Sequence, residues 1–271
     1  MEILSFSRFS EFESWVEDLR AEQKKIKGES RKHYSDLLFR GHADSNWPLL
    51  TTLERYSPKT KSLDNYLYSA DRVKLQAELH AEKKWDPILL KDGSIIRDSE
   101  HSYYAPLPSL EYLVYLRHHG FPSPLLDWTR SPYIAALFAY SECANEAEGN
   151  IAIFVYQEYL GSAKSYAGGG PFIQSIGPYI DTHKRHSIQQ AQYTLCLSFS
   201  NEYGRNHYFT HPHEEYNSPK SHDRMYKITL PKKEKLSILA KLDQFNLNLF
   251  SLYGSEESLM STLALREFYL K

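Results

Sequence analysis

Apolar residues recur along this chain with two periods, which predict helices and strands intermixed along its length. The helical period, an apolar residue every three or four positions, covers 9–20, 63–85, 109–120, 132–141 and 259–270, with a less regular segment at 238–249. Short β-branched or aromatic runs predict strands at 37–39, 125–128, 151–156, 189–197 and 225–230. Residues 89–101 and 201–223 are expected to be loops. We therefore expect an α+β fold in a single mixed domain over residues 1–271.

The most polar junction of the pattern lies where the strand at 125–128 leads into the helix at 132–141. A glycine and two prolines precede the strand and predict a rigid elbow. Thr129 or Ser131 can cap the helix, which has proline in its first turn. Such a junction suits a ligand site and equally a well-capped core. Its polar and aromatic side chains are His118, His119, Asp127, Trp128, Thr129, Arg130 and Ser131.

An arginine follows directly on the strand predicted at 37–39. Arg40 is costly to bury alone, so we expect it to meet a carboxylate or an anionic ligand. Its planar fork suits phosphate, and Gly41 would let a ligand approach the backbone closely. A structural salt bridge is the alternative. The basic residues at 24–32 predict a solvated loop, with a phosphate or nucleic-acid contact as the second interpretation.

Composition and charge limit the classes of function that the sequence supports. With 271 residues, 41% of them apolar and 14% aromatic, the chain can bury a sizeable core. A net charge of −2 gives no global attraction to nucleic acid or to a membrane. The two cysteines are far apart, and His211 and His213 have no companion ligands nearby, so no disulfide or metal site is predicted. Without a signal peptide or spanning segment, we expect a soluble cytoplasmic protein.

Three groups of residues resemble the motifs of the FRG domain family, which is named for a Phe/Tyr-Arg-Gly signature. The first group is Phe39-Arg40-Gly41 with Trp47-Pro48-Leu49 after it. The second and most specific one comprises His118, Gly120, Pro122 and the run from Leu125 to Pro132. The third comprises Arg185, Gln189 and Tyr193. The resemblance covers about residues 34–200 and leaves 201–271 as a C-terminal strand and helix extension.

The order of these motifs is also similar to that of the ADP-ribosyltransferase fold, which implies a split, mostly antiparallel sheet flanked by helices and NAD as substrate. By this resemblance Arg40 binds the NAD phosphates, while Thr129 and Ser131 position the ribose beside nicotinamide. The implied NAD-binding residues are Arg40, Gly41, His118, Trp128, Thr129, Tyr133 and Tyr193. Nicotinamide or adenine would stack on Trp128, Tyr133 or Tyr193, although a place in the core is the favoured interpretation of each aromatic residue.

The third motif of that fold usually carries a catalytic glutamate, and here the matching residues are Gln189-Gln190-Ala191-Gln192. A glutamine can hydrogen-bond a ribose but cannot balance the positive charge that develops at the anomeric carbon. Losing that charge could raise the barrier by several kcal/mol. Asp127 is the nearest carboxylate by motif that could replace it. The implied catalytic set is Arg40, Thr129, Ser131, Gln189 and Asp127.

Three functions remain open. The first is an NAD-dependent ADP-ribosyltransferase acting as an intracellular toxin or antiviral effector on a nucleic-acid or protein acceptor, with an antitoxin or other defence-system partner. The second is a non-catalytic nucleotide- or phosphate-binding module. The third is a nuclease-like hydrolase that pairs His118 or His119 with Asp127. The basic cluster His183, Arg185 and His186 would guide an anionic substrate, or else it is a solvated strand end.

Overall fold

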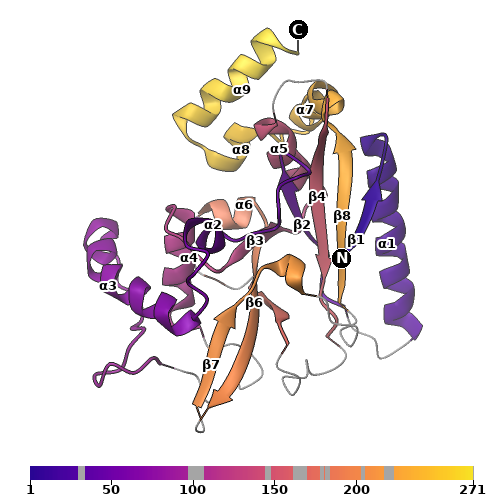
Figure 1. Ribbon diagram of the computed structural model, residues 1–271. Helices are drawn as coiled ribbons and strands as arrows, with labels where there is room; N and C mark the ends of the chain where they lie inside the picture. The colour runs from indigo at the N-terminus through magenta and orange to yellow at the C-terminus, as the bar shows by residue number, and fades with distance from the viewer. Residues whose placement is uncertain are drawn as a thin grey trace.

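A computed structural model describes residues 1–29, 34–96, 107–143, 148–160, 170–177, 180, 184–202, 205–216 and 223–270. In these ranges helices surround one mixed β-sheet (Figure 1). The predicted α+β class and the mostly antiparallel sheet are confirmed. No helix in this part of the chain has the length and apolar character needed to cross a membrane.

The sheet consists of strands β1 (Glu2–Ser5), β2 (Leu38–His42), β3 (Leu126–Thr129), β4 (Asn150–Gln157), β5 (Phe172–Ile176), β6 (Ala191–Glu202), β7 (Arg205–Thr210) and β8 (Arg224–Pro231). Their order is β1-β8-β4-β2-β3-β6-β5, and β7 pairs with β6 on the edge opposite β5. Only the pair of β1 with β8 is parallel among the described strands.

The centre of the sheet is its weakest seam. β2 pairs with β4 over five positions and β3 pairs with β6 over four. Between β2 and β3 there is a single pair, Phe39 with Thr129. Beyond this pair the two strands diverge and leave backbone groups that side chains must satisfy. The candidate site lies at this point of divergence.

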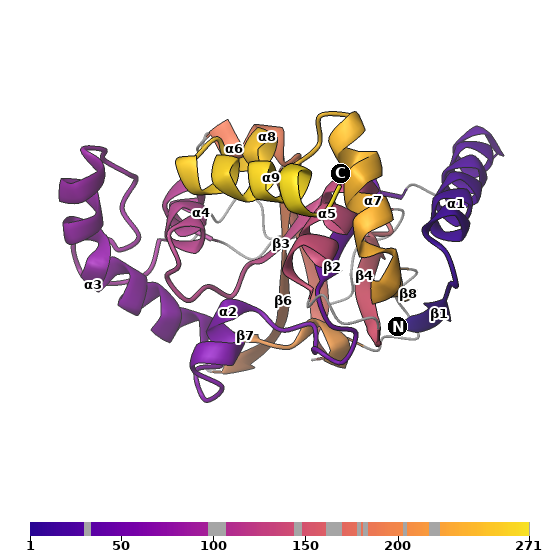
Figure 2. The ribbon, with the colours of Figure 1, turned by 90° about the horizontal axis from the view of Figure 1, so that it is seen from above.

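Helices pack on both faces of the sheet (Figure 2). They are α1 (Phe9–Glu29), α2 (Thr52–Tyr56), α3 (Leu63–Ala81), α4 (Leu110–His118), α5 (Pro132–Glu142), α6 (Lys184–Ile188), α7 (Lys235–Gln244), α8 (Leu249–Tyr253) and α9 (Glu256–Phe268), with short 3-10 turns at His213–Glu215 and Lys232–Glu234. Alternate residues of β4 point to opposite faces. Ile151, Ile153 and Val155 join the core under α1, α5 and α7, while Ala152, Phe154 and Tyr156 join the core under α2, α3 and α4.

The predicted junction between β3 and α5 is confirmed in detail. Ser131 is the N-cap of α5, and its hydroxyl accepts a hydrogen bond from the backbone N–H of Ile134 at 3.3 Å. Pro132 occupies the first turn, where its missing N–H costs nothing. The helix that follows is mostly buried between β2 and α7. This packing fixes the angle at which α5 meets the edge of β2.

Three sequence predictions are wrong. The basic stretch after residue 20 was expected to be a loop, but α1 continues to Glu29, because lysine, glutamine and glutamate are good helix formers. The loop expected at 201–223 contains β7, which forms a six-residue ladder with β6. Gln189 was placed on a strand, yet β6 begins at Ala191, and Gln189 lies in the turn between α6 and β6.

Candidate functional site

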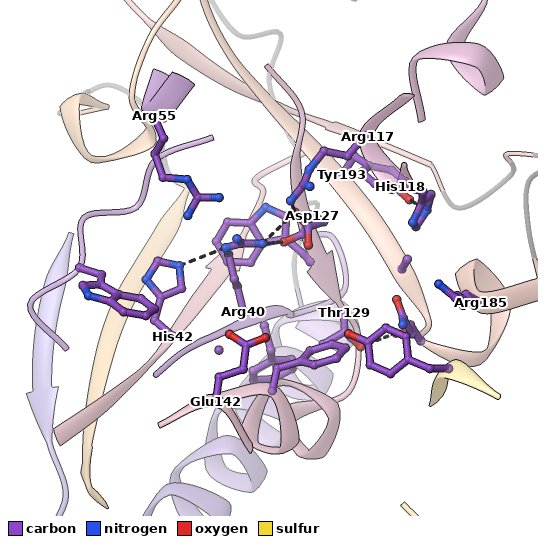
Figure 3. A pocket seen from close by; sticks show the side chains of 18 residues that line it. Arg40, His42, Arg55, Arg117, His118, Asp127, Thr129, Glu142, Arg185 and Tyr193 are labelled. Atoms are coloured by element: carbon purple, nitrogen blue, oxygen red, sulfur yellow. Dashed lines mark hydrogen bonds and ion pairs between the residues drawn. The ribbon is translucent and has the colours of Figure 1, made fainter. Parts of the chain in front are cut away.

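A cavity of about 410 Å³ lies where β2 and β3 diverge (Figure 3). Its volume falls in the usual range of small-molecule sites, roughly 300–1,000 Å³. Residues of β2, β3, β6, α2, α4, α5, α6 and α8 line it, so segments from position 39 to position 253 meet there. A site assembled from so many elements can present several polar groups to one ligand.

Arg40 occupies the opening between the two strands. Its Nη1 donates a hydrogen bond to the backbone carbonyl oxygen of Asp127 at 2.7 Å and forms an ion pair with the Asp127 carboxylate at 2.9 Å. Its Nε donates to Nε2 of His42 at 3.2 Å. The guanidinium thus replaces the strand pairing that β2 and β3 lack here. The expectation that Arg40 meets a carboxylate is confirmed.

Asp127 connects Arg40 to a second arginine. Arg117 of α4 donates from Nη2 to the same carboxylate oxygen, Oδ1. Burial by itself would raise the pKa of the Asp127 carboxyl, but the charges of Arg40 and Arg117 lower this pKa well below its usual range. Asp127 is therefore an anion bound to two cations at neutral pH. It is a poor substitute for a catalytic carboxylate, because its charge is already neutralised.

Two histidines of the cavity are held in the neutral form. Burial and the neighbouring charge of Arg40 lower the pKa of His42 to about 3. Burial lowers the pKa of His118 to about 4, and Nε2 of this ring lies 2.8 Å from the hydroxyl of Tyr193. Neither imidazole contributes positive charge at pH 7. The positive charge of the cavity therefore comes from its arginines.

The charges that face the cavity do not balance. Four arginines line it against two carboxylates, namely Arg40, Arg55, Arg117 and Arg185 against Asp127 and Glu142. Partial burial and the nearby charges of Arg40 and Arg117 lower the pKa of Arg55, which shows how closely these cations are crowded. A concave site with excess positive charge attracts and retains anions. Planar guanidinium forks favour phosphate or carboxylate as the bound group.

Most residues that the sequence predicted for the site do line the cavity, namely Arg40, Gly41, His118, Asp127, Trp128, Thr129, Arg185, Gln189 and Tyr193. Ser131 and Tyr133 are not among them. The Ser131 hydroxyl caps α5, and Tyr133 lies against Phe9 of α1 with ring centroids 6.4 Å apart. The geometry described does not support their predicted contacts with ribose and with a base, which stay predictions.

Three side chains that were predicted to contact the ligand interact with other parts of the protein. The Thr129 hydroxyl donates to the carbonyl oxygen of Gln189 at 2.7 Å and accepts from the N–H of Ser131. The Trp128 indole donates to Thr194 at 2.7 Å and is 3% exposed. Tyr193 is fully buried. Thr129 thus ties β3 to the turn before β6, and the two aromatic rings form the wall of the cavity.

The residues of the predicted basic cluster before β6 do not share one environment in the structure. His183 lies outside the described residues. His186 is 7% exposed and stacks on the Tyr193 ring, with the ring centroids 5.6 Å apart. Arg185 does line the cavity, with its guanidinium 5.4 Å from the ring centroid of Tyr253. One of the three residues is therefore placed to contact an anion there.

Gly41 lines the cavity and also serves the packing of α5. A Cβ at this position would lie 2.0 Å from the carbonyl oxygen of Ala135 and 2.9 Å from the N–H nitrogen of Ala139. Both contacts are with helix backbone, which cannot rotate away as a side chain can. The Phe-Arg-Gly run therefore combines a cation that faces the cavity with a glycine that admits the helix behind it.

Nine residues that line the cavity were not assigned to the site from the sequence. Trp47, Arg55, Arg117 and Glu142 are the ones among them that add an accessible aromatic ring or a charge. Trp47 is 50% exposed, so its ring offers an accessible aromatic face that the buried Trp128 and Tyr193 do not. For Arg117, the sequence did contain a signal, because its charge is opposite to that of Asp127 on the next predicted element. Nothing local distinguishes Arg55 or Glu142 from ordinary surface residues.

The His211 and His213 pair, which was weighed as a metal chelate, divides its two rings between different partners. Nε2 of His211 lies 2.7 Å from the Ser198 hydroxyl, and Nε2 of His213 lies 2.8 Å from the Thr194 hydroxyl. Within the described ranges no group of three or more His, Cys, Asp or Glu residues is arranged to hold a metal ion.

Acid should destabilise the fold partly through Asp127. A carboxyl whose pKa is lowered by folding stabilises the protein above its unfolded pKa, about 3.9, and loses that contribution as the pH falls toward the folded value. We expect the free energy of unfolding, measured with urea, to fall less between pH 5 and pH 2.5 in Asp127→Asn than in wild type. The exposed Asp86→Asn serves as control and should behave as wild type. Equal slopes in all three proteins would contradict the ion-pair account.

Residues 35–148 match the family model of the FRG domain. No curated protein and no solved structure matches the chain. The matched range includes β2, α4, β3 and α5, and with them Arg40, Arg117 and Asp127. The signature arginine and the central motif of the family thus meet in one ion-pair network at the cavity. Residues 35–148 of the chain therefore resemble the FRG domain.

Proposed function

We propose that the cavity binds NAD and that the protein is an NAD-dependent ADP-ribosyltransferase. The observation that carries this proposal is the convergence of four arginines on a cavity of about 410 Å³, with Arg40 at the seam of the sheet. The pyrophosphate of NAD carries two negative charges and has the oxygen geometry that guanidinium forks bind. The order of motifs similar to the ADP-ribosyltransferase fold supports the same substrate.

The pairing of Asp127 supports a mode of binding for the phosphates. Its carboxylate engages Arg40 and Arg117, and phosphate oxygens can accept hydrogen bonds from the same kind of N–H group. Arg55 and Arg185, at other parts of the wall, add charge for the second phosphate. The half-exposed ring of Trp47 offers a face on which nicotinamide or adenine can stack. These groups suit a dinucleotide better than a single small anion.

The hydrolase alternative loses support from the same geometry. A general acid–base pair of His118 with Asp127 needs a proton shared between them. Nε2 of His118 instead faces the Tyr193 hydroxyl, and Asp127 is bound to two arginines. The non-catalytic nucleotide-binding module remains the second candidate. It is favoured by Gln189, which occupies the place of the usual glutamate, and by the neutralised charge of Asp127.

Nicotinamide release from NAD tests the proposal. NAD labelled in its adenylate half would be incubated with the protein and with DNA, RNA or a cell lysate in separate reactions. We expect nicotinamide release together with label transferred to one class of acceptor, which would also test the proposed role as a toxin or antiviral effector. Release without transfer would indicate an NAD glycohydrolase. Saturable NAD binding without release would favour the binding module.

A further inference from the structure

We infer that Glu142 supplies the negative charge that acts at the ribose–nicotinamide bond, in place of the absent third-motif glutamate. This inference rests on the proposed function. It concerns a residue that no motif marks and that lies at the end of α5, not on β6.

Glu142 lines the same cavity as Arg40 and Gln189. Figure 3 shows its carboxylate directed into the cavity from the α5 side. It and Asp127 are the two carboxylates among the lining residues. Asp127 already forms ion pairs with Arg40 and Arg117. Glu142 is therefore the lining carboxylate that remains available to a ligand.

The Glu142 carboxylate accepts no hydrogen bond and forms no ion pair with any residue in the described part of the chain. This contrasts with other acidic side chains, such as Glu13 bound by Lys241, Asp44 bound by Lys232 and Asp243 bound by Arg266. An exposed glutamate without partners is ordinary on an open surface. In a cavity lined by four arginines, a carboxylate that pairs with none of them can interact with a bound ligand.

Helix energetics disfavour an acid at this position. Glu142 is the last residue of α5, where the carbonyl end of the helix is negative, and the last turn of α5 contains no basic residue to offset it. Side chains that oppose the local energetics of the fold are expected chiefly at functional sites. The placement of this charge therefore points to a role in the cavity.

The reaction requires an anion there. The bond from C1′ of the ribose to the nicotinamide nitrogen breaks, and nicotinamide leaves as a neutral molecule with the bonding electron pair. Positive charge then develops on C1′ and the ring oxygen, and a carboxylate stabilises that charge as it forms. The acceptor hydroxyl or amine bonds to C1′ from the vacated side and gives its proton to Glu142 or to water. Gln189, which is neutral, can position a ribose hydroxyl but cannot supply this charge.

The test separates binding from turnover in the full-length chain. Glu142→Gln keeps the shape of the side chain and removes its charge. We expect it to lower the rate of nicotinamide release by about 10²- to 10³-fold, the usual effect of deleting one electrostatic contact to a transition state. The dissociation constant of NAD should stay the same or fall, because a negative charge facing the pyrophosphate has been removed. Glu142→Asp should retain an intermediate rate.

Glu17→Gln is the matched control, since Glu17 is an exposed helical glutamate of α1 outside the cavity. Loss of turnover in Glu142→Gln alone, with NAD binding retained, would support the inference. A wild-type rate in Glu142→Gln would overturn the role of Glu142 and leave the proposed function standing. Wild-type protein that neither binds NAD nor releases nicotinamide would overturn both.

Discussion

Arg40→Ala is expected to abolish measurable nicotinamide release and to weaken NAD binding by about 10- to 150-fold. The binding loss corresponds to roughly 1.5–3 kcal/mol, the usual contribution of a hydrogen bond to a charged group. The physical reason is that Arg40 places its guanidinium at the seam between β2 and β3, from which it reaches both the Asp127 carboxylate and the cavity. Arg40→Lys should give a smaller but clear loss, because lysine keeps the charge without the fork.

The control for this variant must remove an arginine from an aspartate ion pair elsewhere. Arg266 of α9 donates to both carboxylate oxygens of Asp243 at 2.8 Å, outside the cavity. Arg266→Ala should therefore leave binding and turnover unchanged. Circular dichroism should show that all variants remain folded, since Asp127 keeps Arg117 when Arg40 is removed. Wild-type turnover in folded Arg40→Ala would contradict the site.

Gly41→Ala is expected to be among the most destabilising single-methyl additions in the protein. The new Cβ would lie 2.0 Å from the carbonyl oxygen of Ala135, so α5 would have to move away from β2. Overpacking usually costs about 1–3 kcal/mol, and a clash with helix backbone should reach or exceed the upper end of that range. Thermal and urea unfolding would measure the loss. Any activity should fall with stability, because α5 carries Glu142 into the cavity.

Gly170→Ala is the matched control for the loss of a glycine. A Cβ at Gly170 meets nothing within 4 Å. We expect a change within about 0.5 kcal/mol, as for surface substitutions away from special features. If Gly41→Ala were as stable as Gly170→Ala, α5 could not lie against β2 as described.

The sequence predicted most accurately what depends on neighbouring residues. Ser131 and Pro132 predict the start of α5 from capping chemistry alone. The run at 151–156 predicts β4 from its β-branched and aromatic residues. The prediction that Arg40 meets a carboxylate or an anion is confirmed, because a buried charge without a partner is costly. It did not identify that partner, because Asp127 lies 87 positions further along the chain.

Elements that depend on distant pairing were missed. The residues of β7 are mostly polar, and their pattern predicts a loop. They form a strand because they pair with β6. Tyr133 was expected at the ligand, but α5 turns it toward Phe9 of α1 on the other side. Arg55 and Glu142 reach the cavity only because α2 and α5 pack beside it. No local pattern contains that information.

The most direct test of the account is calorimetric titration of NAD into the wild-type protein and into Arg40→Ala, with Arg266→Ala as control. The account predicts one NAD bound per chain in the wild type and in Arg266→Ala, displaced by ADP-ribose, and a loss of about 10- to 150-fold in Arg40→Ala. Absence of binding at millimolar NAD to folded wild-type protein would contradict it. So would equal affinity in Arg40→Ala, because the ligand would then lie outside the cavity.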